Sequence, residues 1–82
     1  MILVDIRVPA LDDSYDFLLD ENTPVDKVLM EIIEMIGKKQ QSNEKLNADD
    51  FLLYNYKKGT QLKLADSLFE SGIRDGDCLL LI

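Results

Sequence analysis

The residues that could carry out chemistry are few, and the most suggestive ones lie near the end of the chain. Asp75, Gly76 and Asp77 place two carboxylates around a glycine, as calcium-binding loops do. Such loops also need further oxygen ligands at fixed spacing and a distant bidentate glutamate, which the surrounding residues do not supply. Aspartate and glycine are equally typical of tight turns. We therefore interpret these residues as a turn, and the pairs Asp12-Asp13 and Asp49-Asp50 as solvated loop charges.

Cys78 is the single cysteine, and the chain contains no histidine. This composition excludes Ser-His-Asp and Cys-His nucleophilic sites, histidine or multi-cysteine metal sites, and an internal disulfide. A thiol becomes reactive only beside a base or a helix N-terminus, so Cys78 is expected to act as a small apolar residue of a strand. The sequence predicts no enzymatic activity, no cofactor and no metal.

The overall composition indicates one soluble domain spanning residues 1–82. The net charge of −7 argues against nucleic acid and against an anionic membrane surface, because both would repel it. That charge suits a basic protein partner, although acidic residues also serve solubility alone. We see neither a signal peptide nor an apolar run of about 20 residues, so neither secretion nor membrane insertion is expected. The expected location is the cytoplasm.

Two strands and a helix are predicted in the first half of the chain. Apolar residues alternate with polar ones in Ile2–Val8 and again in Tyr15–Asp20, which predicts an antiparallel hairpin. Thr23 and Pro24 form a helix start, with Thr23 as the capping residue and Pro24 in the first turn. Apolar residues then recur every three or four positions, and Gly37 is predicted to end the helix.

The second half is predicted to contain three further strands. Lys38–Asp50 is polar and is expected to be a loop with at most one helical turn. Phe51–Tyr56 is the third strand, Gln61–Leu64 the fourth and Cys78–Ile82 the last, with a turn of helix near Ala65–Glu70. The predicted fold class is therefore α+β, a mixed sheet of four to five strands in the order β-β-α-β-β-β with one helix packed across one face.

Such a sheet has an outer face that no second layer covers. If Leu79 and Leu81 point at the helix, strand alternation sends their neighbours outward. A contiguous apolar patch on that face would mark an interaction surface, although scattered exposed leucines are normal in soluble proteins. The residues predicted to point outward are Cys78, Leu80 and Ile82 on the last strand and Leu3 and Leu18 on the first two, and Met30 lies off the apolar stripe of the helix.

The element order, together with the turn at Ser71–Asp77 before an apolar strand, resembles ubiquitin-like β-grasp domains over essentially the whole chain. Within that superfamily, the sequence resembles the YukD/EsaB family, the small ubiquitin-like proteins of bacterial type VII (WXG100) secretion systems. The residues that carry this likeness are Val4-Asp5-Ile6, Asp16-Phe17, the helix start Pro24–Val28 and the turn residues Gly72-Ile73 and Gly76-Asp77.

The resemblance implies an accessory or regulatory protein that binds partners through the outer face of its sheet. The implied partner is the cytosolic domain of a secretion-machine membrane component or the FtsK-like ATPase, which would recruit the protein to the inner face of the membrane. A homodimer stays open, as does the alternative of a small ubiquitin-like auxiliary subunit in a multicomponent enzyme such as a bacterial monooxygenase. The predicted protein-binding residues are Leu3, Leu53, Cys78, Leu80 and Ile82.

Ubiquitin and the bacterial sulfur carriers end in a di-glycine tail that is activated by a partner enzyme. This sequence ends at Ile82 and has no glycine after Gly76. We therefore expect neither conjugation nor sulfur transfer. A native chain that continued beyond Ile82 to a Gly-Gly end would revive the carrier hypothesis.

Overall fold

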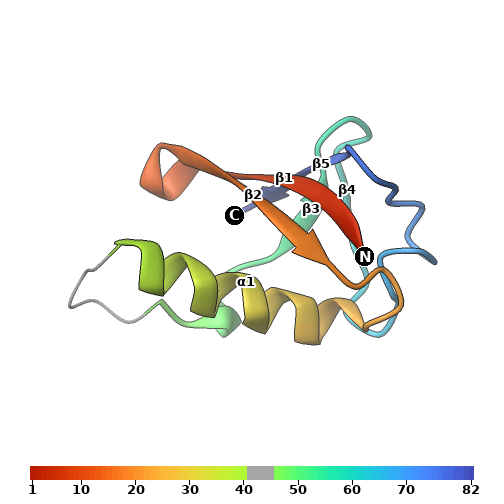
Figure 1. Ribbon diagram of the computed structural model, residues 1–82, viewed down its shortest axis with the longest axis horizontal. Helices are drawn as coiled ribbons and strands as arrows, with labels where there is room; N and C mark the ends of the chain where they lie inside the picture. Colours follow the sequence, from red (N-terminus) through yellow and green to blue (C-terminus); the bar gives the residue numbers. More distant parts are fainter. Residues whose placement is uncertain (41–45) are drawn as a thin grey trace.

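The computed structural model describes residues 1–40 and 46–82, which form a mixed sheet of five strands with one long helix across one face (Figure 1). The strand order is β2-β1-β5-β3-β4; β1 and β5 are parallel, and the other pairs are antiparallel. The α+β architecture and the element order predicted from the sequence are confirmed. The elements are β1 (Ile2–Val8), η1 (Pro9–Leu11), β2 (Asp13–Leu19), α1 (Val25–Gln40), η2 (Ala48–Asp50), β3 (Leu53–Asn55), β4 (Thr60–Gln61) and β5 (Cys78–Leu81).

The first two strands form the predicted hairpin, joined by a single 3-10 turn. Pro9 begins that turn because its fixed φ suits a first helical position. Asp12 ends it in the left-handed region with a φ of 50°, and its N–H donates to the Pro9 carbonyl at 3.1 Å. Alternate residues of β1 are buried, which fixes the face that the strand turns toward the helix.

The helix begins one residue later than predicted. The Val28 N–H donates to the Pro24 carbonyl at 3.1 Å, so Pro24 occupies the capping position that the sequence assigned to Thr23. The N–H groups of the first helical turn have no partners inside the helix, and two of them donate to carbonyls of another segment. Val25 donates to the Asp66 carbonyl at 2.8 Å, and Asp26 donates to that of Leu64 at 3.1 Å. Backbone of the late loop therefore caps this helix.

The predicted helix end at Gly37 is wrong, because α1 continues to Gln40. A terminating glycine adopts a positive φ, whereas the positive-φ glycines here are Gly59, Gly72 and Gly76. A glycine inside a helix costs about 1 kcal/mol relative to alanine. The burial of Ile36 beside it offsets that cost, since covering a large apolar side chain contributes about 1.5–3 kcal/mol.

The core lies between α1 and the inner face of the sheet. The apolar stripe of the helix packs against alternate residues of the strands, and the late loop closes one end. The buried apolar residues are Val4, Ile6, Val8, Phe17, Leu19, Val25, Val28, Leu29, Ile32, Ile33, Ile36, Leu53, Leu62, Leu68, Ile73, Leu79 and Leu81.

The middle strands are shorter than predicted. The expected strand Phe51–Tyr56 narrows to Leu53–Asn55. The fourth strand was predicted at Gln61–Leu64 but is observed at Thr60–Gln61. Gln61 pairs with Tyr54, and the side chain of Leu62, the next residue, is buried in the core. Within the predicted loop Lys38–Asp50, the first residues extend α1 and Ala48–Asp50 forms a 3-10 turn. Residues 41–45 of that loop lie outside the described residues.

The helical turn expected near Ala65–Glu70 is present as one turn. The Ser71 N–H closes it on the Ser67 carbonyl at 3.0 Å. Ser67 and Glu70 form a reciprocal capping box, in which each side chain accepts from the backbone N–H of the other at 3.0 Å. This turn holds Leu68 in the core beneath the start of α1.

Candidate protein-binding surface

The pairing register determines which side chains share the outer face of the sheet, because residues directly opposite each other on neighbouring strands point the same way. Leu80 lies opposite Arg7 of β1 and opposite Tyr54 of β3. Cys78 lies opposite Asp5 on one side, and on the other its carbonyl accepts from the Tyr56 N–H at 3.1 Å. These residues alternate with the buried Leu79 and Leu81, so they face away from α1.

The register extends beyond the end of β5. Ile82 and Leu52 exchange two backbone hydrogen bonds, of 2.8 and 3.0 Å, so the pair continues the ladder between β5 and β3. Their side chains lie on the outer face and are 54% and 37% exposed. We call the following set the outer patch: Leu52, Tyr54, Tyr56, Cys78, Leu80 and Ile82.

Three of the predicted binding residues come together in this patch, namely Cys78, Leu80 and Ile82. Leu3 also lies on the outer face and is 47% exposed, but it sits opposite Leu18 at the other end of the β1–β2 pair. In the parallel register, Asp5 lies beside Cys78 and Arg7 lies beside Leu80, whereas Leu3 precedes both. Leu3 therefore pairs with Leu18 and lies at the margin of the outer patch.

Leu53 does not belong to the outer face, and its predicted position is wrong. It lies opposite Leu81, which points at α1, and only 1% of Leu53 is exposed. The strand alternates around Leu53, so its neighbours Leu52 and Tyr54 occupy the outer face instead.

The sequence reasoning missed Leu52, Tyr54 and Tyr56. The two tyrosines carried a usable signal, because they are spaced two apart at the end of the predicted third strand. Assigning Leu53 to the core would have placed both on the outer face. Tyrosine is enriched at protein interfaces because it combines a large apolar ring with a polar tip.

A charged pair borders the outer patch on the β1 side. The Arg7 guanidinium lies 4.4 Å from the centre of the Tyr56 ring, and its Nε lies 3.5 Å from the Asp5 carboxylate. Both side chains are partly exposed, so each contact contributes little to stability. A shallow depression of about 480 Å³ opens here, lined by Asp5, Arg7, Val8, Pro9, Asp12, Asp13, Ser14, Tyr56 and Leu80.

The electrostatics around Cys78 favour an unreactive thiol. Burial raises the pKa of Cys78, and the negative charge of Asp5 raises it further, while Arg7 opposes the shift. The thiolate is therefore disfavoured, and a nucleophile would need the opposite shift. Within residues 1–40 and 46–82, no group of three or more acidic or cysteine side chains is arranged to hold a metal ion.

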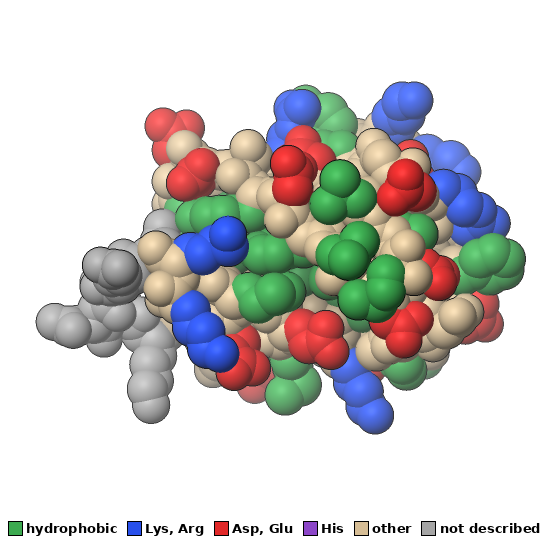
Figure 2. All heavy atoms as spheres, viewed as in Figure 1, with side chains coloured by type: hydrophobic (Ala, Val, Ile, Leu, Met, Phe, Trp, Pro, Cys, Tyr) green, Lys and Arg blue, Asp and Glu red, His purple; other side chains and the backbone are tan. Residues whose placement is uncertain are grey.

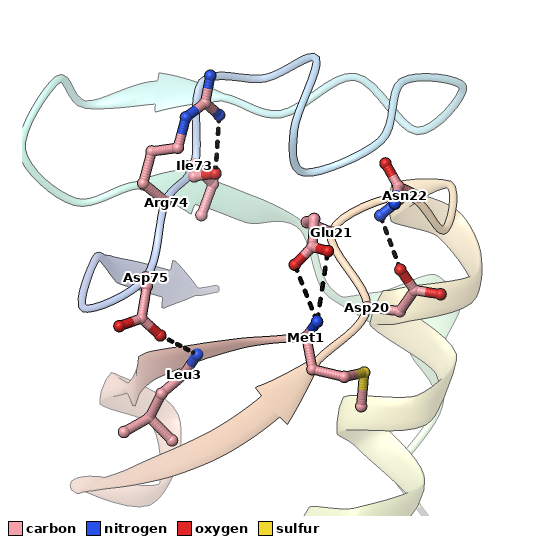
Figure 3. A network of polar contacts seen from close by, with 8 residues as sticks. All are labelled: Met1, Leu3, Asp20, Glu21, Asn22, Ile73, Arg74 and Asp75. Atoms are coloured by element: carbon pink, nitrogen blue, oxygen red, sulfur yellow. Dashed lines mark hydrogen bonds and ion pairs between the residues drawn. The ribbon is translucent and has the colours of Figure 1, made fainter.

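Polar contacts of the loop before β5 position that strand against β1 (Figure 3). The Leu3 N–H donates to the Asp75 carboxylate at 2.8 Å, and the Leu3 carbonyl accepts from the Gly76 N–H at 2.7 Å. Gly76 has a φ of 86°, a conformation that glycine adopts without strain. The Asp77 carboxylate accepts from the Arg74 N–H at 2.8 Å. These aspartates thus serve as the turn residues that the sequence predicted.

A further contact in Figure 3 fastens the neighbouring segment. The Met1 amino group lies 3.3 Å from each carboxylate oxygen of Glu21. Arg74 donates to the carbonyls of Phe69 and Ile73 at 3.1 and 3.0 Å while stacking on the Phe69 ring at 4.3 Å. The first contact ties the start of the chain to the segment before α1, and the contacts of Arg74 stabilise the loop before β5 internally.

The family model for the WXG100 protein secretion system (Wss) protein YukD matches residues 3–81 of this chain. The chain belongs to the YukD family. Its membership places it among the ubiquitin-like proteins of type VII secretion, as the sequence resemblance predicted. A search of the curated proteins finds no match.

Solved structures with ubiquitin-like folds superpose on nearly the whole YukD-family chain. The EccD5 ubiquitin-like domain from Mycobacterium xenopi aligns with a TM-score of 0.78 at 23% identity, covering 99% of this chain and 91% of that one. Caldiarchaeum subterraneum ubiquitin aligns with a TM-score of 0.75 at 26% identity, covering 99% and 90%. The N-terminal ubiquitin-like domain in the 4931431F19Rik protein gives 0.73 at 28%, covering 99% and 72%. The ubiquitin-like β-grasp fold is thereby confirmed.

The described part of this YukD-family chain has one α-helix, α1, with 16 residues. No helix there is long and apolar enough to cross a membrane.

Proposed function

We propose that this YukD-family chain is a non-catalytic module of a type VII secretion system that binds a partner protein through its outer patch. One observation carries the proposal: apolar side chains from β3 and β5 gather on a sheet face that no described element covers. Tyr56 and Ile82 are 47% and 54% exposed there. Apolar side chains that remain exposed after folding gain hydrophobic free energy only when a binding partner removes them from water.

The proposed partner is the cytosolic domain of a membrane component of the secretion machine or its FtsK-like ATPase. Family membership supports a partner within that machine. The net charge of −7 suits a basic docking surface, since complementary charge speeds encounter and sets orientation. The protein would then act from the cytoplasm and reach the inner face of the membrane through its partner.

Arg7 and Asp5 would form the polar rim of this interface. Apolar interfaces are typically surrounded by charged or hydrogen-bonding groups that orient the partner and exclude water. The shallow depression beside Tyr56 and Leu80 would accept a protruding side chain of the partner.

The test is an affinity pull-down from detergent-solubilised source cells, read by mass spectrometry, with wild type beside Leu80→Glu. Met30→Glu is the matched control, because Met30 is 62% exposed on α1 and lies on the other side of the molecule from the outer patch. We expect wild type and Met30→Glu to recover a secretion-machine membrane component or the ATPase. Leu80→Glu should lose that component while keeping a wild-type circular dichroism spectrum.

Two results would contradict the proposal. Equal recovery by all three proteins would remove the outer patch as the docking site. Recovery of oxygenase subunits in place of secretion proteins would favour an auxiliary subunit of a multicomponent enzyme.

A further inference from the structure

A second surface, separate from the outer patch, lies along the free edge of the sheet. The strand order places β2 at one end, paired on one side with β1. At seven residues, β2 is much longer than β4, which forms the opposite edge with two. None of the described strands pairs with the other side of β2. A long unpaired edge is the part of a sheet that can receive an added strand.

The hydrogen bonds of β1 show which backbone groups of β2 face that edge. Both backbone groups of Leu3 and the N–H of Asp5 bond toward β5 or the loop before it. Backbone groups alternate sides along a strand, so the even-numbered residues of β1 pair with β2. Their partners Asp13, Tyr15, Phe17 and Leu19 consequently face β1. The residues whose backbone groups face the free edge are Ser14, Asp16 and Leu18.

At the Ser14 end of this edge, the backbone N–H already has a hydrogen-bond partner within the chain. The Ser14 N–H donates to the Asp13 carboxylate at 2.8 Å. The open segment therefore centres on Asp16 and Leu18, each of which presents one N–H and one carbonyl. An added strand can bond to all four groups.

The side chains around this segment differ between its two sides. On the outer side, Asp16 lies directly opposite Asp5, and like charges so placed repel each other. Asp5 has Arg7 at 3.5 Å, whereas Asp16 forms no ion pair with any residue that the structure describes. A cation placed beside Asp16 would relieve this repulsion.

On the side of the β2 edge that faces the helix, two aromatic rings lie beside a positively charged lysine, in contrast to the negative charge of Asp16 on the outer side. Tyr15 and Phe17 stack with their ring centres 6.0 Å apart, and the Lys39 ammonium lies 5.9 Å from the Phe17 ring. Figure 2 shows hydrophobic side chains reaching the surface between β2 and α1, with Lys or Arg side chains beside them. Because Lys39 already places a cation on this side of the edge, an uncharged side chain of an added strand fits here better than a second cation does.

We propose that the β2 edge binds an extended segment of a partner protein as a sixth strand, with basic residues alternating with apolar ones. The basic residues lie on the outer side, next to Asp16, and the apolar ones lie on the helix side, next to the partly buried Tyr15. The backbone groups of Asp16 and Leu18 supply the hydrogen bonds. This assignment does not depend on the outer patch, which lies on the opposite flank of β1.

A second copy of the chain is a poor occupant of the same edge. Antiparallel pairing of two β2 strands would bring their Asp16 carboxylates opposite or diagonal to each other. Each copy also carries a net charge of −7. The charge of Asp16 therefore disfavours pairing between two copies, as charges on edge strands commonly do. The same charge favours an added strand with basic residues.

The test is a titration of the ¹⁵N-labelled protein with a short blocked peptide of alternating lysine and valine, followed by amide chemical shifts. We expect the largest shifts in β2 and at the facing residues of α1, and weaker binding as salt is raised. A peptide with glutamate in place of lysine should leave the spectrum unchanged. Shifts centred on β5 and β3 instead would overturn the proposal.

Two variants separate the backbone and charge contributions. Leu18→Pro removes an N–H that faces the free edge of β2, a position where an edge strand tolerates proline. This variant should show no amide chemical-shift changes when the peptide is added. Asp16→Lys keeps the backbone edge intact and should weaken binding about tenfold by replacing attraction with repulsion. Met30→Glu, on the exposed side of α1, is the control and should bind as wild type does.

Unchanged affinity in Asp16→Lys would contradict the proposed charge selection. Full binding by a folded Leu18→Pro variant would contradict strand addition. Concentration-dependent shifts in β2 without any peptide would show that a second copy occupies the edge, which also contradicts the proposal.

Discussion

The two faces of the sheet are built from adjacent residues of the same strands and differ in what covers them. In β5, Leu79 and Leu81 are fully buried beneath α1, while Leu80 between them is only partly buried. Their side chains have the same composition. The difference shows that hydropathy alone does not separate a core residue from a binding residue in this chain, because only the helix decides which face is covered.

The sharpest test of this comparison places the same charge on each face of β5. Leu81→Glu would bury a carboxylate in the core, and its desolvation would exceed the roughly 5–10 kcal/mol that holds a small domain folded. Leu80→Glu should lower the free energy of unfolding by about 1 kcal/mol, because its carboxylate reaches water. Urea unfolding followed by circular dichroism measures both. A folded Leu81→Glu protein would mean that the two faces are not distinct.

The next test uses two neighbouring leucines of the β3 segment. Leu53→Ala should cost about 2–5 kcal/mol, the usual effect of truncating a fully buried leucine. Leu52→Ala, at a residue that is 37% exposed, should cost about 1 kcal/mol. The comparison of their unfolding midpoints in urea decides the assignment. Equal costs would return Leu53 to the outer face.

A smaller effect is expected at the rim of the outer patch. Arg7→Ala removes the stacking on Tyr56 and the ion pair with Asp5 and should lower the free energy of unfolding by less than Leu52→Ala does, because water screens both contacts. Arg7→Lys is the matched variant, since it keeps the charge and loses the planar stacking group. If Arg7→Ala destabilised the protein as much as Leu53→Ala, the outer face would have to be regarded as a second core.

The smallest effect concerns Cys78. Burial raises its pKa above the ordinary value of 9.0, so iodoacetamide should alkylate the folded protein more slowly at pH 8 than the urea-unfolded protein. The protonated thiol is the form that folding favours. Its contribution to stability is therefore complete below the ordinary pKa and is lost as pH rises through the folded pKa. Mass spectrometry of the alkylated protein provides the rates; faster reaction of the folded protein would contradict this.

The sequence predicted those parts of the fold that depend on neighbouring residues. The alternation in Ile2–Val8 and the apolar stripe of the helix are local, and both elements formed as expected. The helix end predicted at Gly37 was wrong because a glycine ends a helix in this way only when its φ becomes positive, and residue type alone does not determine that angle.

The candidate site was predicted only in part, because its β3 half depends on long-range pairing. Phe51–Tyr56 contains two adjacent leucines, so alternation alone allowed either one to face outward. The pairing of Leu53 with Leu81 decides between them. The unpaired backbone groups of Asp16 and Leu18 also depend on long-range pairing. They are free because β2 lies at the edge of the sheet, and the sequence of β2 by itself does not reveal that position.

The parallel pairing of β1 with β5 has a consequence for synthesis on the ribosome. Among the strands of this sheet, β1 is synthesised before the others and β5 after them, yet the two pair in its centre, and Asp75 and Gly76 secure that contact through Leu3. Contacts between residues so far apart in sequence form late in folding. The outer patch draws on β5, so it cannot form until β5 has been synthesised and has paired with β3. A partner that recognises this surface therefore recognises the folded domain and not a chain in which β5 is still missing.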